Sequence, residues 1–142
     1  MSSGGSSRRS CWHFPPTSRP SWASRSRSRH RAPAAVGSRV HLLRQRADAG
    51  ECDLIAKTEG FDVEAGFVYV GSGLFASDRR ALPPINYAAL RLLATHSGRP
   101  VTYTCVPPGS GERIGVDRDG DGFWDGDERT AHTDPADPTS TP

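Results

Sequence analysis

The segment DRDGDGFWDGDE, Asp117 to Glu128, decides how the carboxyl-terminal part of the chain folds. Acidic residues occupy positions 1, 3, 5, 9 and 12 of this segment, and Gly122 occupies position 6. A solvated turn or a strand-ending loop would also be rich in Asp and Gly, but it would not require this order. At average residue frequencies, we expect a chance match to this order of residues in roughly one of several thousand chains of this length. We therefore interpret the segment as a cation site.

The spacing predicts a loop that wraps around one calcium ion, which takes roughly six to eight oxygen ligands. The order of residues resembles the EF-hand loop. The ligands that this resemblance implies are carboxylate oxygens of Asp117, Asp119 and Asp121, the backbone carbonyl of Phe123, Asp125 directly or through water, and both oxygens of Glu128. Gly122 lies where the loop turns sharply and a Cβ would be costly. Trp124 is expected to point inward as an apolar anchor.

The residues on either side of the loop differ from those of a complete EF-hand. Residues 107–116 contain two prolines and three glycines, so we predict that no helix enters the loop. After Glu128 we predict one short helical turn through Ala131, which Asp134 and Pro135 stop.

The segment resembles the calcium-binding repeats of the thrombospondin type 3 kind, in which DxDGxxDxxD is followed by a TDPxDP-like linker. The matching residues are Asp119, Asp121, Gly122, Asp125 and Asp127, then Thr133, Asp134, Pro135, Asp137 and Pro138. The resemblance implies that Asp127, Asp134 and Asp137 can bind further ions. Similar loops occur in dockerins, but in pairs followed by long helices, so cohesin binding is not expected. Residues 48–142 as a whole resemble the C-terminal portion of larger secreted bacterial proteins.

The net charge of +2 conceals a basic and an acidic part of the chain. Residues 1–46 contain ten Arg and no acidic residue, whereas the remainder carries eight basic and all 16 acidic residues, which gives charges of +10 and −8. The Ser-, Arg- and Pro-rich start predicts a disordered arm over residues 1–47. Such an arm can bind RNA or another polyanion through phosphate contacts, with Trp12 and Trp22 available to stack on bases. Because the SRSRSR run is short, we favour an unstructured leader, and nucleic acid is not the expected partner.

Two of the three cysteines, Cys52 and Cys105, lie on separate predicted strands, and Cys11 lies in the arm. A disulfide between Cys52 and Cys105 is possible, and two buried free thiols are the alternative. Calcium at roughly millimolar concentration and a small core suit an extracellular or cell-surface setting, which favours the disulfide. The sequence contains no apolar stretch that would form a signal peptide or a membrane span.

The central residues predict a small α+β unit. Short apolar runs bounded by Gly or charged residues predict strands at residues 52–57, 66–70, 74–78, 101–105 and 113–116. Asn86 can cap a helix that runs from Tyr87 to about His96 and stops at Gly98. The expected organisation is a disordered basic arm (1–47), an antiparallel sheet with one helix (48–116), and the calcium loop with an acidic tail (117–142).

No constellation of residues indicates an active site. Gly109, Gly111 and Gly115 approach a dinucleotide-binding fingerprint, but the third glycine is displaced by one position and no helix is expected after it. We identify no nucleophile or carboxylate partner for His96 or His132 from the sequence. We therefore expect a non-catalytic calcium-binding structural module at the end of a secreted protein. The alternatives are an Arg-rich nucleic-acid-binding protein and the accessory tail of a secreted enzyme.

Overall fold

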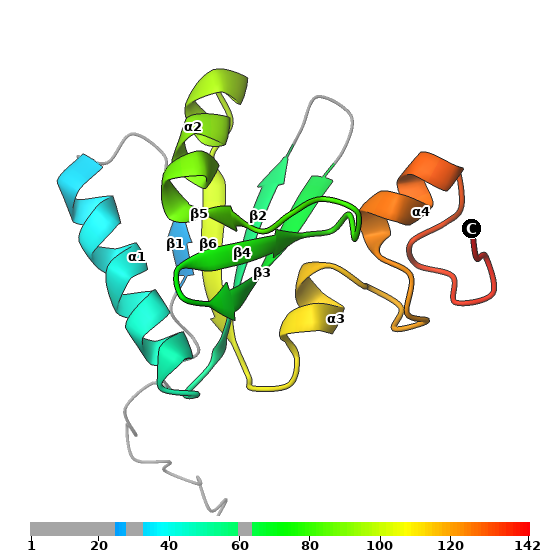
Figure 1. Cartoon of the computed structure of the whole chain (residues 1–142), viewed down its shortest axis with the longest axis horizontal. Helices are drawn as coiled ribbons and strands as arrows, with labels where there is room; N and C mark the ends of the chain where they lie inside the picture. Colours follow the sequence, from blue (N-terminus) through cyan, green and yellow to red (C-terminus); the bar gives the residue numbers. More distant parts are fainter. Residues whose placement is uncertain (1–24, 28–32, 60–63) are drawn as a thin grey trace, which may run out of the picture.

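The computed structural model describes residues 25–27, 33–59 and 64–142 of the chain (Figure 1). The elements within these ranges are, in order, β1 (Arg25–Arg27), α1 (Pro33–Asp48), β2 (Asp53–Glu59), β3 (Glu64–Gly71), β4 (Leu74–Ser77), β5 (Ile85–Asn86), α2 (Tyr87–Ser97), β6 (Val101–Val106), α3 (Gly111–Gly115) and α4 (Asp125–Ala131). The fold class is α+β, as the sequence predicts. Four of the five predicted strands are confirmed, as β2, β3, β4 and β6.

The strands form one antiparallel sheet in the order β1-β6-β2-β3-β4-β5. In the middle of the sheet, Leu54 of β2 pairs with Cys105 of β6, and Ala56 pairs with Phe67 of β3. Because successive side chains of a strand point to opposite faces, these four residues share one face and Ile55 belongs to the other. The two faces are covered by different helices.

Helices α1 and α2 cover the first face (Figure 1). Helix α2 begins at Asn86, whose side chain accepts a hydrogen bond from Ala89 N at 2.9 Å, and it ends at Gly98, whose φ is 65°. Both ends agree with the sequence prediction. The hydrophobic core between these helices and the sheet consists of Val40, Leu43, Cys52, Leu54, Ala56, Phe67, Phe75, Leu90, Val101, Tyr103 and Cys105.

Helix α1 corrects the prediction of a disordered arm over residues 1–47. One side of the helix meets the core through apolar residues spaced by four, three and four positions, namely Val36, Val40, Leu43 and Ala47. This stripe is narrow, and three Arg residues lie between its members. The prediction is therefore wrong for residues 33–47, and the sheet carries two long helices instead of the single one expected. Residues 1–24 and 28–32 lie outside the described residues.

Helix α3 lies on the second face and corrects two further predictions. The sequence predicts a strand at residues 113–116 and no helix before the loop, but Gly111–Gly115 is helical. A Cβ on Gly111 would lie 2.6 Å from the Cβ of Asp53, whose Oδ2 accepts a hydrogen bond from Gly111 N at 2.8 Å. The glycines that argue against a helix are therefore the residues that let a short helix approach the sheet this closely.

A disulfide joins Cys52 and Cys105, whose Cα atoms are 5.5 Å apart. This confirms the bridged alternative over the two free thiols. The bond links the residue that precedes β2 to the neighbouring strand β6, on the core face of the sheet. Within the described ranges, none of the helices combines the length and the apolar character needed to cross a membrane.

Candidate metal centre

The segment Asp117–Glu128 forms a closed loop between α3 and the first turn of α4. The base of the loop is closed by Asp125 N, which donates a hydrogen bond to the carbonyl oxygen of Val116 at 2.8 Å. Gly120 and Gly122 have φ values of 79° and 94°, a region that L side chains rarely adopt. The glycine at position 6 is therefore explained by backbone conformation, as the sequence predicts.

Three aspartates of the loop converge. Asp117, Asp119 and Asp121 each offer one carboxylate oxygen, and these oxygens lie within 4.8 Å of one another. The Oδ1 atoms of Asp119 and Asp121 accept hydrogen bonds from backbone N–H groups inside the loop, at 3.3 and 2.8 Å. Their Oδ2 atoms are buried and have no hydrogen-bond partner among the described residues. Each side chain is thus fixed through one oxygen, while the other oxygen is left for a ligand.

Asp117 has a different environment from the other two aspartates. It is 6% exposed, and both of its carboxylate oxygens accept hydrogen bonds from loop N–H groups, from Gly120 N at 2.7 Å and from Gly122 N at 3.1 Å. A carboxylate oxygen has two lone pairs, so it can hold an N–H group and a cation together. These bonds also connect the first position of the loop to its sharp turn.

Glu128 provides the strongest indication that this loop binds a cation. Its side chain is 0% exposed, and neither carboxylate oxygen has a hydrogen-bond partner in the described part of the chain. Buried charged groups are normally paired or coordinated, because desolvation without compensation is costly. Burial, followed by repulsion from Asp119, Asp121, Asp125 and Asp117, raises the pKa of Glu128 to about 7. A divalent cation would satisfy both oxygens and offset this repulsion.

Asp125 is held partly by arginines. It is 3% exposed, its Oδ1 accepts a hydrogen bond from Arg118 N at 2.7 Å, and its Oδ2 lies 3.9 Å from Arg118 Nε and from Arg129 Nη1. Of the two modes expected for position 9, binding through water suits a carboxylate with these contacts better. The guanidinium of Arg118 pairs with Glu64 at 3.0 Å. Burial acts to raise the pKa of Glu64, but Lys57 and then Arg118 outweigh it and lower that pKa.

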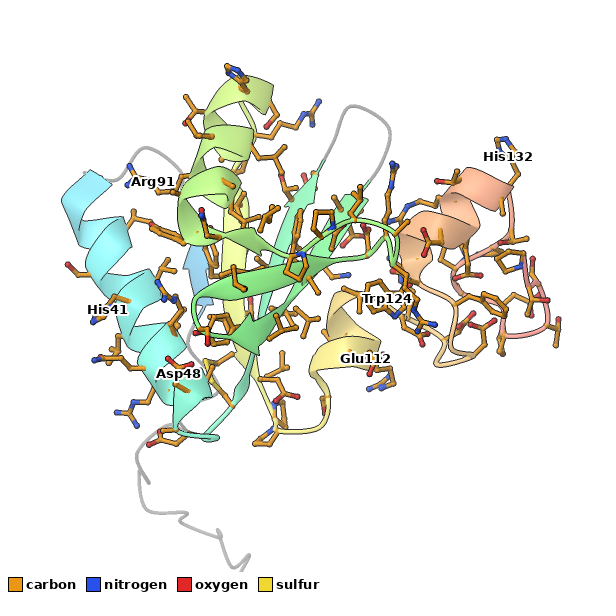
Figure 2. All side chains as sticks on the ribbon, viewed as in Figure 1. His41, Asp48, Arg91, Glu112, Trp124 and His132 are labelled. Carbon is orange, nitrogen blue, oxygen red and sulfur yellow. A yellow bond between two sulfur atoms is a disulfide. The ribbon has the colours of Figure 1, made fainter. Side chains whose placement is uncertain are left out.

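Phe123 and Trp124 complete the loop. The side chain of Phe123 is 43% exposed, whereas its expected contribution is a backbone carbonyl, which does not depend on the side chain. Trp124 is half-buried, and the guanidinium carbon of Arg80 lies 5.0 Å from the centre of its ring. In Figure 2, Trp124 lies where the loop meets the rest of the protein. It contacts the segment that follows β4, which fits an anchoring role.

The three acidic residues implied as ligands of further ions have local hydrogen bonds. Asp127 Oδ2 accepts from Arg80 N at 2.9 Å, which ties α4 to the segment after β4. Asp134 Oδ1 accepts from Ala136 N at 3.0 Å. Asp137 Oδ1 accepts from the Oγ1 and the N–H of Thr139, and these bonds lower the pKa of Asp137. Asp127 thus fixes α4, whereas Asp134 and Asp137 shape the tail, and none of the three belongs to the converging group of aspartates.

The elements around the loop add contacts that the sequence reasoning missed. Helix α4 runs to Ala131, as predicted, and His132 ends it in the left-handed conformation with a φ of 64°. The first turn of α4 is fixed to Asp78, which is buried at the end of β4. The sequence signal for this contact is Gly126, at position 10 of the loop. The calcium pattern gives no reason for a glycine there, so a close approach of another segment was the alternative explanation.

Comparison with protein families identifies the segment. Residues 117–138 match the family model of the bacterial TSP3 repeat, so the resemblance inferred from the sequence is confirmed. TSP3 repeats are of a calcium-binding type, and the converging aspartates within the match could hold a metal ion. The match covers the loop, α4 and the tail as far as Pro138. Comparisons with curated proteins and with solved structures gave no significant match.

Proposed function

We propose that this chain is a non-catalytic structural module whose loop, Asp117–Glu128, binds one calcium ion. The expected ligands are those of the sequence prediction, with binding through water chosen for Asp125: Asp117, Asp119, Asp121, the carbonyl of Phe123, Asp125, and both oxygens of Glu128. The observation that carries the proposal is the fully buried Glu128 carboxylate, whose two oxygens lack partners among the described residues. A bound divalent cation would satisfy both oxygens and offset the repulsion from the four aspartates that act on this group.

The donor set favours calcium over other divalent ions. All the side chains that face the site offer oxygen, which suits hard cations and not zinc or copper. Magnesium requires near-ideal octahedral geometry and keeps several of its waters. A twelve-residue loop that ends in a glutamate able to bind through both oxygens suits the larger calcium ion instead.

The proposed role of the ion is to hold the acidic end of the chain in one conformation. Residues 117–137 carry eight acidic and two basic side chains, a net charge of −6. Like charges at this density repel one another, and a bound divalent cation reduces that repulsion. For a single loop we expect a dissociation constant of roughly 10⁻⁴ to 10⁻³ M, as in extracellular calcium modules.

The setting that fits this affinity is extracellular. Calcium at such concentrations and a stable disulfide are both features of oxidising compartments outside the cytoplasm. The Cys52–Cys105 disulfide and the TSP3 repeat agree with each other on this point. We propose that the module belongs to the terminal part of a secreted protein.

Calorimetric titration of the full chain with calcium tests the proposal. The wild type is expected to release or absorb heat with a stoichiometry of about one ion. Glu128→Gln keeps the size of the side chain but removes its charge, and Asp117→Ala removes a side chain from the converging group; both are expected to abolish binding. Asp48→Asn serves as the control, because it removes a carboxylate on α1 that bonds Tyr69 and lies outside the repeat. Unchanged heats in all four proteins would refute the ligand set.

A further inference from the structure

Asp78 directly follows β4, lies outside the repeat, and is 3% exposed. Its backbone carbonyl accepts a hydrogen bond from Gly126 N at 2.9 Å. Its Oδ2 accepts hydrogen bonds from Arg129 Nη2 and from Gly66 N, the latter at 3.0 Å, and its Oδ1 accepts one from Ser77 Oγ at 3.2 Å. Both the backbone and the side chain of one buried residue therefore contact the same helix.

The two contacts on α4 lie on either side of Glu128. Gly126 is two residues before it and Arg129 is one residue after it, so the helical turn that carries Glu128 is fixed at both ends. A Cβ on Gly126 would lie 2.6 Å from the carbonyl oxygen of Asp78, which shows how closely the helix approaches. A third contact, from Arg80 N to Asp127 Oδ2 at 2.9 Å, fixes the same turn.

The entrance of the loop is fixed at the same place on the sheet. Asp78 N donates to the carbonyl of Gly66 at 2.9 Å, and Gly66 N donates back to the Asp78 side chain. Gly66 also meets α3, because a Cβ there would lie only 1.9 Å from the carbonyl oxygen of Gly115. Gly115 is two residues before the first aspartate of the loop. The Asp78–Gly66 pair therefore contacts both the end of α3 and the first turn of α4.

We infer that Asp78 is a positioning residue for the calcium site, which holds Glu128 opposite Asp117, Asp119 and Asp121. The inference rests on the proposed function. Repulsion among these carboxylates would move α4 away in the absence of a cation, and the bonds from Asp78 to Gly126 and Arg129 oppose that movement. The site is then assembled before the ion arrives, so less of the binding free energy is spent on ordering it.

A positioning role and a purely structural role predict different measurements. If Asp78 only stabilises the fold, Asp78→Asn lowers the melting temperature equally with and without calcium and leaves the dissociation constant unchanged. If it positions Glu128, the variant binds calcium more weakly, and the rise in melting temperature on adding calcium becomes smaller. Asparagine has the same shape and keeps one oxygen for Gly66 N, but it weakens the charge-assisted bond to Arg129.

The experiment is a calcium titration by calorimetry of the full chain, with melting curves at zero and saturating calcium. Asp78→Asn and Gly126→Ala are each expected to weaken binding about tenfold, as loss of one buried charge-assisted bond or displacement of α4 would do. Asp48→Asn is the control. Asp48 belongs to α1, its carboxylate accepts a hydrogen bond from the Tyr69 hydroxyl at 2.8 Å, and it lies far from Trp124 and the loop (Figure 2).

Gly126→Ala displaces α4 from its own side and keeps every charge. If circular dichroism shows that Asp78→Asn is unfolded, the calcium affinity of Gly126→Ala tests the inference instead. If the folded Asp78→Asn and Gly126→Ala variants bind calcium with the wild-type affinity, the inference is refuted and the proposed calcium site is not. A wild-type chain that does not bind calcium would refute the proposed function, and the inference with it. The two failures are therefore distinguished by the wild-type titration alone.

Discussion

The carbonyl oxygen of Gly115 lies 1.9 Å from the position that a Cβ of Gly66 would occupy. No other residue type fits at position 66 without moving the backbone of α3, because the obstacle is a main-chain atom. This contact joins the second face of the sheet to the helix that leads into the loop. It gives the first of four predictions.

Gly66→Ala is expected to destabilise the protein by about 1–3 kcal/mol or more, as overpacking of a close contact does. Gly37→Ala is the matched control: it lies in α1, where an added Cβ would have no heavy atom within 4 Å, and it should stabilise the protein by about 0.5–1 kcal/mol. Urea denaturation of both variants measures the two effects. If both substitutions changed the free energy of unfolding in the same direction, that result would contradict the contact between Gly66 and α3.

Glu128 gives a prediction on pH. The pKa of Glu128 is about 7 in the calcium-free fold, whereas its ordinary value is 4.5. Between these two pH values, the folded protein therefore holds a proton on Glu128 that the unfolded chain has lost. Without calcium, the contribution of Glu128 to the free energy of unfolding is therefore fully present below pH 4.5. It is lost as the pH rises towards 7, and the loss is on the order of 3 kcal/mol.

Glu128→Gln tests that dependence because it removes the titrating group. In the absence of calcium at pH 8, the variant should melt at a higher temperature than the wild type, although it is expected not to bind the ion. Calcium binding by the wild type should also weaken between pH 8 and pH 6, because the ion must displace the proton. Melting curves of both proteins that stay parallel from pH 5 to pH 8 would contradict the environment described for Glu128.

The Cys52–Cys105 disulfide closes a segment with a sequence separation of 53 residues. Its removal in the double variant Cys52→Ser/Cys105→Ser should lower the free energy of unfolding by about 2–5 kcal/mol. Addition of a reductant to the wild type should have a similar effect. Cys11→Ser is the control, and guanidinium denaturation with and without reductant is the measurement. A reductant that lowers the stability of the double variant as much as that of the wild type would argue against the bridge.

Helix α1 gives a prediction that separates a packed helix from an unstructured arm. Leu43 is 5% exposed and its neighbour Leu42 is 51% exposed. Leu43→Ala should cost about 2–5 kcal/mol, as a cavity in a core does, whereas Leu42→Ala should change stability by less than about 0.5 kcal/mol. Equal effects of the two substitutions in urea denaturation would mean that α1 does not pack on the sheet.

The parts of the fold that the sequence predicted are those governed by local rules. The strands at β2, β3, β4 and β6 are short apolar runs with clear breaks, and the ends of α2 follow from the capping residue Asn86 and from Gly98. The order of acidic residues in the loop similarly predicted the three converging aspartates, because calcium ligands within one segment are set by spacing.

The errors arose where distant residues decide the local structure. Helix α1 has a four-residue apolar stripe among arginines, and only the sheet below it makes that stripe favourable to bury. Helix α3 contains glycines at both ends, which on their own argue against a helix, but Asp53 and Gly66 provide the partners that they need. Asp78 gave no local signal, since its role depends on an α4 that begins 47 residues later.

The hydrophobic core lies on one face of the sheet with α1 and α2, whereas the acidic loop is attached through α3 and α4 to the other side. Formation of the core and capture of the ion can thus be separate events in time. A chain built in this way can complete its folding where free calcium is scarce. Under the proposed function, the later addition of calcium would change only one end of the molecule.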